Sequence, residues 1–300
     1  MSSDADLALP KAAAWFRFAS GTATHLGAVV PADRTGSPAW FDLGAQDVHA
    51  LLQQGALRRD DLDQRIAQGR PMPAPDRFAV PVPRPGKILC LAKNYVAHAK
   101  EFGAEPPGEP IFFAKLPDCL LAAGQAVVIP HWLESRVDHE AELGLILGFA
   151  DPQERGARYP TTEQAPALVA GYTVLNDVTA RKLQGQDRDA RYPWLRSKAL
   201  DTFCPVGPFV VPADAIDPSD LPISMTVNGQ LRQQARTSDM VFSIEAALVA
   251  MGRCTTLRPG DLIAMGTPEG VGPIEHGDTM VAAVDGLGQL QNTVTREHRP

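Results

Sequence analysis

Short apolar runs separated by Gly, Pro and Asp recur along the whole chain, a pattern that predicts many strands and few helices. The first 42 residues contain three such runs, AWFRF, HLGAVV and WFDL. Two helices are predicted next, at residues 45–54 and 60–67. Residues 71–87 are dense in proline, which neither continues a helix nor donates to a strand ladder. This segment is therefore predicted to connect a small N-terminal domain, residues 1–80, to a larger domain, residues 81–300.

The larger domain is predicted to be mainly β. The apolar runs predict strands at residues 87–91, 111–115, 125–129, 143–147 and 170–176. Residues 94–102 are predicted to form a helix that ends at Gly103, and residues 179–184 a helical turn. Together these elements give an α+β fold class that is mainly β, with a small N-terminal α+β domain.

Two further signals lie near the C-terminus. The dipeptide Asn228-Gly229 predicts a hairpin after residues 223–227, because these two residues accept the positive φ angles of a type I′ turn. Ser238 is predicted to cap a helix whose buried face carries Ile244 and, one turn on either side, Met240 and Leu248.

Composition and charge exclude several classes of partner. A hydrophobic content of 44% and a charged content of 21% are ordinary for a globular protein. The net charge of −7 argues against nucleic acid or an anionic membrane as the main partner. No apolar run reaches the length of a membrane span, and the N-terminus lacks a secretory pattern, so a cytoplasmic location is expected. The four cysteines are widely spaced and are interpreted as reduced, mostly buried thiols.

An acidic row precedes one of the apolar strands. Asp138, Glu140 and Glu142 occupy alternate positions, so in a strand their carboxylates would leave the same face. Unit charges about 4 Å apart repel by about 4 kcal/mol at the effective dielectric near a protein surface. A solvated edge strand, a raised pKa or a bound divalent cation would each relieve that repulsion. Because the row runs into an apolar segment, the cation is the leading hypothesis.

Asp177 is the best candidate for a third ligand. It follows an apolar strand at the start of a loop, where functional residues tend to gather, although it could simply cap the next turn. With Glu140 and Glu142 it would form an all-carboxylate site suited to Mg²⁺, Mn²⁺ or Ca²⁺ and poorly suited to Zn²⁺. The remaining coordination positions would stay open to water and a chelating substrate.

Three more residues are candidates for acid–base chemistry. His98 and Glu101 lie three positions apart in a predicted helix, so the carboxylate can orient the imidazole as a general base for water. An ordinary surface His–Glu pair is the alternative. Lys198, between Trp194 and Phe203, is either an electrophilic stabiliser or a lysine that extends its ammonium into water.

The glycine-rich stretch at residues 266–272, GTPEGVG, is not a P-loop, because no Lys-Ser/Thr pair follows it. Its backbone N–H groups and Thr267 could hold a carboxylate, or the stretch could be a plain turn. The chain has no G-x-S-x-G elbow, which argues against a serine hydrolase of the α/β type.

From about Pro85 to Val294 the chain resembles the fumarylacetoacetate hydrolase family. Six blocks stand in the family's order: KILCLAKNYVAHAKE, PIFFAK, DHEAELGLILG, GYTVLNDVTARKLQ, SKALDTFCPVGP and GTPEGVG. The residues before them resemble the small N-terminal domain that many members carry. Lys182, Ala92 and Ser197 stand where the family commonly has an acidic residue and two glycines.

The resemblance implies a catalytic domain of mixed β-roll, β-barrel-like type, a homodimer and a Mg²⁺ or Mn²⁺ ion. It implies one role for each matching residue: metal ligands Glu140, Glu142 and Asp177, catalytic residues His98, Glu101 and Lys198, and substrate-binding residues Thr267, Lys115 and Gln184.

The activity expected from the resemblance is hydrolysis of a carbon–carbon bond in a 2,4-dioxo acid such as an acylpyruvate or fumarylpyruvate. Decarboxylation, hydration or isomerisation of a 2-oxo acid is the alternative, since one fold hosts several reactions. A catalytically silent, metal-binding dimer is the third possibility, and the retained His98–Glu101 pair argues against it.

Overall fold

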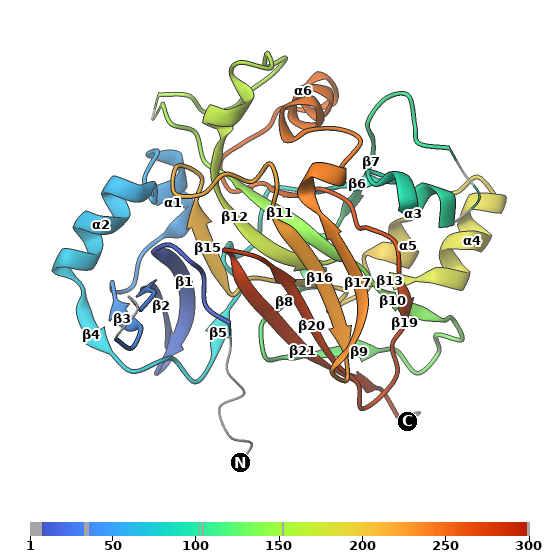
Figure 1. Cartoon of the computed structure of the whole chain (residues 1–300), viewed down its shortest axis with the longest axis horizontal. Helices are drawn as coiled ribbons and strands as arrows, with labels where there is room; N and C mark the ends of the chain where they lie inside the picture. The colour runs from blue at the N-terminus through green and yellow to red at the C-terminus, as the bar shows by residue number, and fades with distance from the viewer. Residues whose placement is uncertain (1–7, 33–35, 102, 104, 152, 299–300) are drawn as a thin grey trace.

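The computed structural model describes residues 8–32, 36–101, 103, 105–151 and 153–298. In these residues the strands form three sheets, and none of them closes into a barrel. The mainly β, α+β fold class predicted from the sequence is confirmed. Figure 1 shows the N-terminal strands at one side and a group of short helices at the other.

The largest sheet has 13 strands. Its main path runs β4 (Arg70–Met72), β3 (Ala39–Asp42), β2 (Ala23–Val30), β1 (Ala14–Ser20), β15 (Phe209–Pro212), β12 (Val169–Asn176), β11 (Ala141–Leu147), β18 (Leu262–Ala264), β6 (Ile88–Ala92) and β7 (Ile111–Lys115). Three short strands pair beside this path: β5 (Phe78–Ala79), β14 (Cys204–Val206) and β8 (Leu120–Ala122). Strands β11 and β12 lie at its centre, and every residue of both is buried.

The other two sheets flank these central strands. One contains β13 (Thr179–Ala180), β10 (Val137–His139) and β19 (Gly272–Pro273). The other contains β17 (Gln230–Arg236), β16 (Pro222–Val227), β20 (Thr279–Val284), β21 (Gly288–Arg296) and β9 (Ala126–Ile129). The five-stranded sheet packs against β11 and β12 (Figure 1). Apolar side chains of both layers form one core.

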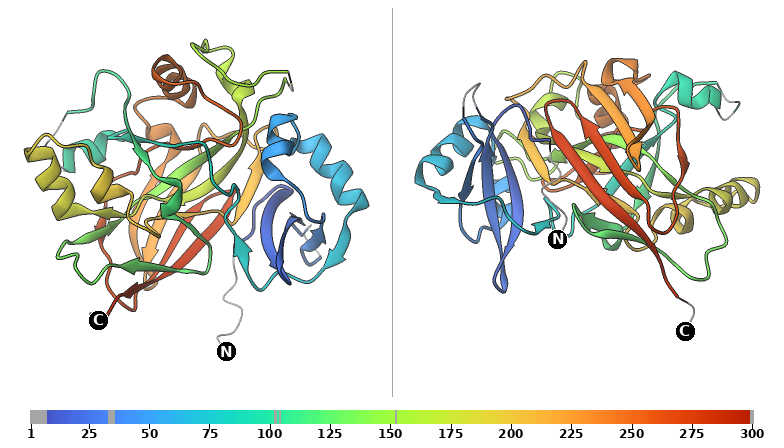
Figure 2. Two further views of the ribbon diagram at one scale, coloured as in Figure 1. Left: turned by 180° about the vertical axis from the view of Figure 1, so that it is seen from behind. Right: turned by 60° about the horizontal axis from the view of Figure 1, so that its bottom comes forward.

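The helices are short and lie around the sheets. They are α1 (Val48–Gln53), α2 (Arg59–Gln68), α3 (Val96–Glu101), α4 (Arg181–Asp189), α5 (Leu195–Lys198) and α6 (Ile244–Cys254), with 3₁₀ turns η1 (Pro117–Cys119), η2 (Ala165–Leu168) and η3 (Thr237–Asp239). Both views in Figure 2 place α1 and α2 beside the N-terminal strands, away from α3, α4 and α5. Among the described residues no helix is long and apolar enough to cross a bilayer.

The hairpin prediction is confirmed and one helix prediction is wrong. Asn228 and Gly229 have φ angles of 52° and 74° and join β16 to β17. The helix predicted to follow Ser238 begins only after Ser243, whose Oγ accepts the backbone N–H of Ala246 at 3.3 Å. Ser238 lies instead in the 3₁₀ turn η3, which separates Met240 from the helix although its spacing fits the apolar stripe.

The N-terminal strands continue the central sheet. Strand β1 pairs antiparallel with β15, with Trp15 opposite Val210 and Phe16 opposite Phe209. The rings of Phe16 and Phe209 meet edge to face with their centroids 6.1 Å apart. Successive strand pairings from β1 through β15 and β12 to β11 therefore link the first 80 residues to the acidic row. The domain boundary near residue 80 stays a prediction.

Candidate active site

The acidic row lies at the junction of β10 and β11, and it is not solvated. Asp138, Glu140 and Glu142 expose 0%, 3% and 1% of their surface, so the edge-strand alternative is wrong. Glu140 is the single residue between the two strands. Its backbone N–H donates to the side-chain Oδ1 of Asn176 at 2.8 Å, and its carbonyl accepts the N–H of Asp177 at 2.8 Å. These bonds tie the backbones of two candidate ligands together.

The three predicted ligands converge. Each of Glu140, Glu142 and Asp177 contributes a carboxylate oxygen, and these oxygens all lie within 4.8 Å of one another. The Oε2 of Glu142 accepts the N–H of Gly266 at 2.7 Å. Gly266 has a φ of +90°, and a Cβ there would lie 2.8 Å from the Cβ of Asn94. Only glycine fits this close approach, so the GTPEGVG stretch supplies a backbone donor to the cluster.

Two buried lysines bind the same carboxylates. The Nζ of Lys115 lies 2.6 Å from one oxygen of Asp177, and the Nζ of Lys198 lies 2.5 Å from the other. Lys198 also donates to Glu140 at 2.8 Å, and its ammonium lies 4.8 Å from the centre of the Phe113 ring. The alternative that Lys198 extends into water is therefore wrong. Burial alone would lower its pKa, but Asp177 and Glu140 outweigh burial and raise it, so the ammonium stays charged.

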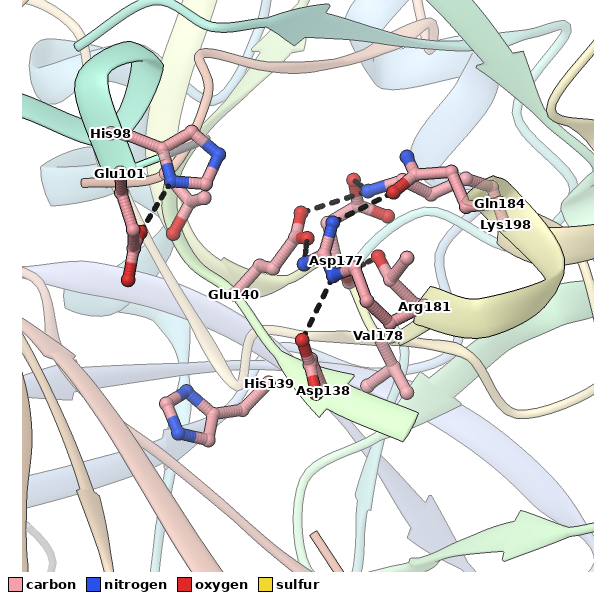
Figure 3. Close-up of polar contacts among 12 residues, drawn as sticks. His98, Glu101, Asp138, His139, Glu140, Asp177, Val178, Arg181, Gln184 and Lys198 are labelled. Atoms are coloured by element: carbon pink, nitrogen blue, oxygen red, sulfur yellow. Dashed lines mark hydrogen bonds and ion pairs between the residues drawn. The ribbon is translucent and has the colours of Figure 1, made fainter. Parts of the chain in front are cut away.

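A residue that the sequence reasoning missed, Arg181, links the cluster to Asp138. Its Nε donates to Asp138 at 2.8 Å, its Nη2 bonds Glu140, and its Nη1 donates to Gln184 at 2.7 Å (Figure 3). Arg136 also binds Asp138, at 2.5 Å. Asp138 therefore has two cationic partners and holds Arg181 against the candidate ligand Glu140. The sequence signal for this residue is the arginine of the GYTVLNDVTARKLQ block itself.

The electrostatics separate the two glutamates. Burial opposes ionisation of both, but Lys198 and Arg181 hold the pKa of Glu140 well below its usual range. For Glu142 burial comes first and the carboxylates of Asp177 and Glu140 add to it, so its pKa is raised well above the usual value. Glu142 is thus the carboxylate whose charge the chain's own groups balance least.

The donor set fits a hard divalent cation. Four carboxylates are buried here, from Asp138, Glu140, Glu142 and Asp177. Lys115, Lys198, Arg181 and the half-exposed Arg136 form ion pairs with Asp138, Glu140 and Asp177. None of these ion pairs involves Glu142, so a bound cation would offset the charge that this carboxylate takes when it ionises. All three converging ligands offer oxygen atoms, which suits Mg²⁺, Mn²⁺ or Ca²⁺ and disfavours Zn²⁺.

The His98–Glu101 pair forms on α3 as predicted from its spacing. The Nδ1 of His98 lies 3.2 Å from Glu101 Oε2, and Glu101 Oε1 accepts the N–H of Gly270 at 3.3 Å. His98 is buried, with 7% of its surface exposed, so it is not an ordinary surface histidine. Burial lowers its pKa, and Glu140 and Glu101 partly offset that effect. In Figure 3 the other ring nitrogen of His98 points toward the carboxylate cluster.

A cavity of about 280 Å³ joins these groups. Its wall includes His98, Glu140, Glu142, Lys198, Gln184 and Thr267, together with Arg181, Arg188, Lys93, Phe113 and Trp194. Lys115 is not among the lining residues, and its ammonium binds Asp177 and the carbonyl of Val178 instead. The structure therefore brings eight of the nine predicted residues to the cavity or to a group that lines it, and places Lys115 behind the cluster.

Known proteins share this arrangement of strands. The family profile described as fumarylacetoacetate (FAA) hydrolase C-terminal matches residues 87–295. The mitochondrial oxaloacetate tautomerase FAHD1 of Arabidopsis thaliana is 38% identical over 214 residues, which cover 71% of this chain and 93% of that protein. The structure of fumarylacetoacetate hydrolase from Exiguobacterium antarcticum is 32% identical with a TM-score of 0.78, covering 95% of this chain and all of that one. Fumarylpyruvate hydrolase from Pseudomonas aeruginosa, solved with Mn²⁺ and pyruvate, is 36% identical with a TM-score of 0.65, covering 74% and 93%.

Proposed function

Because this chain belongs to the fumarylacetoacetate hydrolase family, we propose that it is a divalent-metal-dependent enzyme that hydrolyses a carbon–carbon bond in a 2,4-dioxo acid. One observation carries the proposal. A buried carboxylate cluster and an imidazole oriented by a carboxylate face the same cavity. The first is suited to holding a cation that a 2-oxo acid can chelate, and the second is suited to activating water.

Glu140, Glu142 and Asp177 would hold the cation, and we propose Mg²⁺ or Mn²⁺. When bound, the cation would polarise the substrate's carboxylate and 2-oxo group and stabilise negative charge that develops there. Support comes from the oxygen-only donors and from the Pseudomonas aeruginosa fumarylpyruvate hydrolase, which was solved with Mn²⁺ and pyruvate.

His98 would act as the general base. With the Nδ1 proton directed at Glu101, Nε2 is the nitrogen that would take a proton from water. The hydroxide oxygen attacks the 4-oxo carbon, and the bond between C3 and C4 then breaks with its electron pair going to C3. One product is a carboxylic acid and the other is the enolate of a pyruvate unit, whose charge the Lys198 ammonium helps to stabilise. Return of the proton from His98 to C3 completes pyruvate.

The cavity wall favours a substrate whose distal end is also anionic. Lys93 and Arg188 line the cavity in addition to the cations that bind the carboxylate cluster. The side chain of Arg188 forms an ion pair with its neighbour Asp189, and both are exposed. Exposed pairs contribute little, so Arg188 can turn to a substrate carboxylate. A dicarboxylate such as fumarylpyruvate fits this wall better than an acylpyruvate whose distal end is uncharged.

The second candidate is isomerisation of a 2-oxo acid, which the similarity to an oxaloacetate tautomerase favours. In that reaction His98 would move a proton between C3 and the 2-oxo oxygen, and no water would be consumed. Decarboxylation and hydration would use the same groups. We also propose a cytoplasmic homodimer, supported by the acidic composition and by an apolar groove beside β7 that includes Ile111, Tyr192 and Leu195. Sedimentation velocity would measure the oligomeric state.

The decisive experiment compares products. Purified protein with Mg²⁺ would be given fumarylpyruvate, acetylpyruvate and oxaloacetate, and the products would be quantified by chromatography. The hydrolase proposal predicts pyruvate and fumarate in equal amounts from fumarylpyruvate, with a lower kcat/KM for acetylpyruvate. Enol–keto interconversion of oxaloacetate without any cleavage of the other two compounds would contradict the hydrolase proposal and support isomerisation instead.

A further inference from the structure

We propose that Gln233, a buried residue of β17, is a positioning residue that makes the Thr267 hydroxyl a hydrogen-bond donor to the substrate's carboxylate. The inference rests on the proposed function only for the identity of that substrate as a 2-oxo acid. Gln233 is the one buried residue of β17, whose other six residues are exposed or half-buried. A polar residue buried alone on an exposed hairpin strand points to a specific task for its amide.

The amide of Gln233 makes four hydrogen bonds. Its Oε1 accepts from the backbone N–H of Ala141 at 3.0 Å and lies 3.1 Å from the Nδ1 of His139. Its Nε2 donates to the carbonyl of Pro268 at 2.9 Å and to the Oγ1 of Thr267 at 2.8 Å. One side chain thus connects the start of β11 to the GTPEGVG loop.

Two of these partners leave no choice of orientation. The Ala141 N–H can only donate and the Pro268 carbonyl can only accept, so the oxygen of the amide must face Ala141 and its nitrogen must face Pro268. In a flipped amide the Nε2 donor would face the Ala141 N–H donor, and the Oε1 acceptor would face the Pro268 carbonyl acceptor. The backbone therefore determines which atom of Gln233 meets Thr267.

The orientation of the Gln233 amide determines how the Thr267 hydroxyl takes part in hydrogen bonds. A hydroxyl has one proton and accepts through its lone pairs, and here Gln233 Nε2 occupies it as an acceptor. Its own proton is left to donate elsewhere, and Thr267 lines the cavity. A carboxylate in the cavity would accept a hydrogen bond from the Thr267 hydroxyl. Hydrogen bonds to charged groups are stronger than those between neutral groups. Without Gln233 the proton could instead turn to the vacated carbonyl of Pro268.

The same orientation determines the tautomer of His139. Because the Oε1 of Gln233 can only accept, the Nδ1 of His139 must carry the proton. Its Nε2 is buried and has no hydrogen-bond partner among the described residues, which agrees with an unprotonated atom. The tautomer of His139 therefore shows which way the Gln233 amide is oriented in the unaltered protein.

A double-mutant cycle tests the proposal with oxalate as the probe, because oxalate presents a carboxylate and an adjacent oxygen as a 2-oxo acid does. Gln233→Met keeps the side-chain length and removes the amide, and Thr267→Val keeps the shape and removes the hydroxyl. Calorimetry with Mg²⁺-loaded protein should show about tenfold weaker oxalate binding for each variant. The double variant should bind no more weakly than Thr267→Val alone, because Gln233 acts through that hydroxyl. The exposed neighbour change Gln234→Met is the matched control and should leave oxalate affinity unchanged.

Either of two results would overturn the proposal. Additive losses in the double variant, or unchanged oxalate affinity in Gln233→Met, would show that Gln233 supports only the fold. Should Gln233→Met not fold, ¹⁵N NMR of the histidines in the unaltered protein, with His139 assigned by His139→Gln, gives the second test. A proton on Nε2 of His139 would contradict the direction of the network. Neither measurement needs turnover, so a failure of the proposed hydrolysis would leave both readable.

Discussion

The carboxylate cluster and the His98–Glu101 pair face one cavity, but the fold holds them in different ways. Glu142 lies in β11, Glu140 directly precedes β11, and Asp177 directly follows β12. These two central strands pair with Glu142 opposite Leu175, and all their residues are buried. The pair stands on α3, a helix of six residues, and Glu101 exposes 32% of its side chain. The carboxylates proposed to hold the cation are built into the core, and the pair proposed to activate water lies on a separate helix at its edge.

The relatives of this chain include a protein named as a tautomerase and one named as a hydrolase. Under the proposed mechanism, a change on α3 would alter the reaction without disturbing the strands next to the carboxylates that would hold the cation. The side chain of Asn94 fastens the start of α3, donating to the carbonyls of Phe242 and Met265 at 3.2 and 2.8 Å. The comparison therefore predicts that cluster variants lose metal binding and that α3 variants keep it.

The largest effect is expected from Asp177→Asn. It removes the common partner of Lys115 and Lys198 and leaves two buried ammonium groups without that charge. We expect loss of turnover, loss of Mg²⁺ binding by calorimetry and a fall of about 3–5 kcal/mol in the free energy of unfolding. Asp261→Asn is the matched control, since Asp261 is buried and paired with Lys87 at 2.5 Å outside the cluster. That control should lose stability but keep Mg²⁺ affinity, and equal loss of affinity in both variants would contradict the site.

Glu142→Gln sharpens the comparison within the cluster. The pKa of Glu142 is raised in the folded protein by burial and by Asp177 and Glu140, so ionising it costs stability as the pH rises through that pKa. In EDTA at pH 8 the variant should therefore melt at the same temperature as the unaltered protein or higher. Added Mg²⁺ should stabilise the unaltered protein and not the variant. Melting curves with and without Mg²⁺ test this, and a variant still stabilised by Mg²⁺ would remove Glu142 from the ligand set.

His98→Asn tests the other side of the comparison. Loss of a general base is expected to lower turnover by about 10²–10⁴-fold. Mg²⁺ and oxalate affinities by calorimetry should stay within about twofold, because asparagine leaves the cluster's own contacts in place. His131→Asn removes the partly exposed His131–Glu297 pair, 3.3 Å apart, and is the control for loss of any histidine. Full activity in His98→Asn would contradict the proposal that His98 on α3 is the general base.

The smallest effect is a shift in pH dependence. Burial lowers the pKa of His98 below its usual 6.5, so the acid limb of kcat/KM should lie below pH 6.5. Glu101 raises that pKa, and Glu101→Gln should therefore move the limb to still lower pH while reducing the plateau rate. A pH–rate series checks the direction, with the exposed Glu105→Gln as control. A limb that moves to higher pH would show that Glu101 does not act on His98.

Much of the site was predictable because its residues lie close together in sequence or at strand ends. The alternation of Asp138, Glu140 and Glu142 and the three-residue spacing of His98 and Glu101 are local patterns. In the structure Glu140 and Glu142 converge, and His98 pairs with Glu101. The six motifs predicted the family, and the match to residues 87–295 confirmed it.

The rest depended on contacts between residues far apart in the chain. Nothing near Gln233 shows that its amide meets residues 92 and 34 positions away. The aromatic neighbours of Lys198 in sequence are Trp194 and Phe203, but the ring that lies beside its ammonium is Phe113, from β7. Likewise, the apolar stripe that includes Met240 continued past the true start of α6, because η3 interrupts the helix without changing the spacing.

The pairing of β1 with β15 also covers a strand edge of the central sheet. β15 lies between β1 and β12, so its far edge is covered only by the N-terminal strands. Removing residues 1–80 would bare backbone donors and acceptors along Phe209–Pro212 together with the Phe209 ring that Phe16 covers. Such an edge is a template for pairing with other chains and leads to aggregation. We therefore expect the N-terminal strands to keep this edge of β15 from pairing with the same edge of another molecule, a task independent of any part in catalysis.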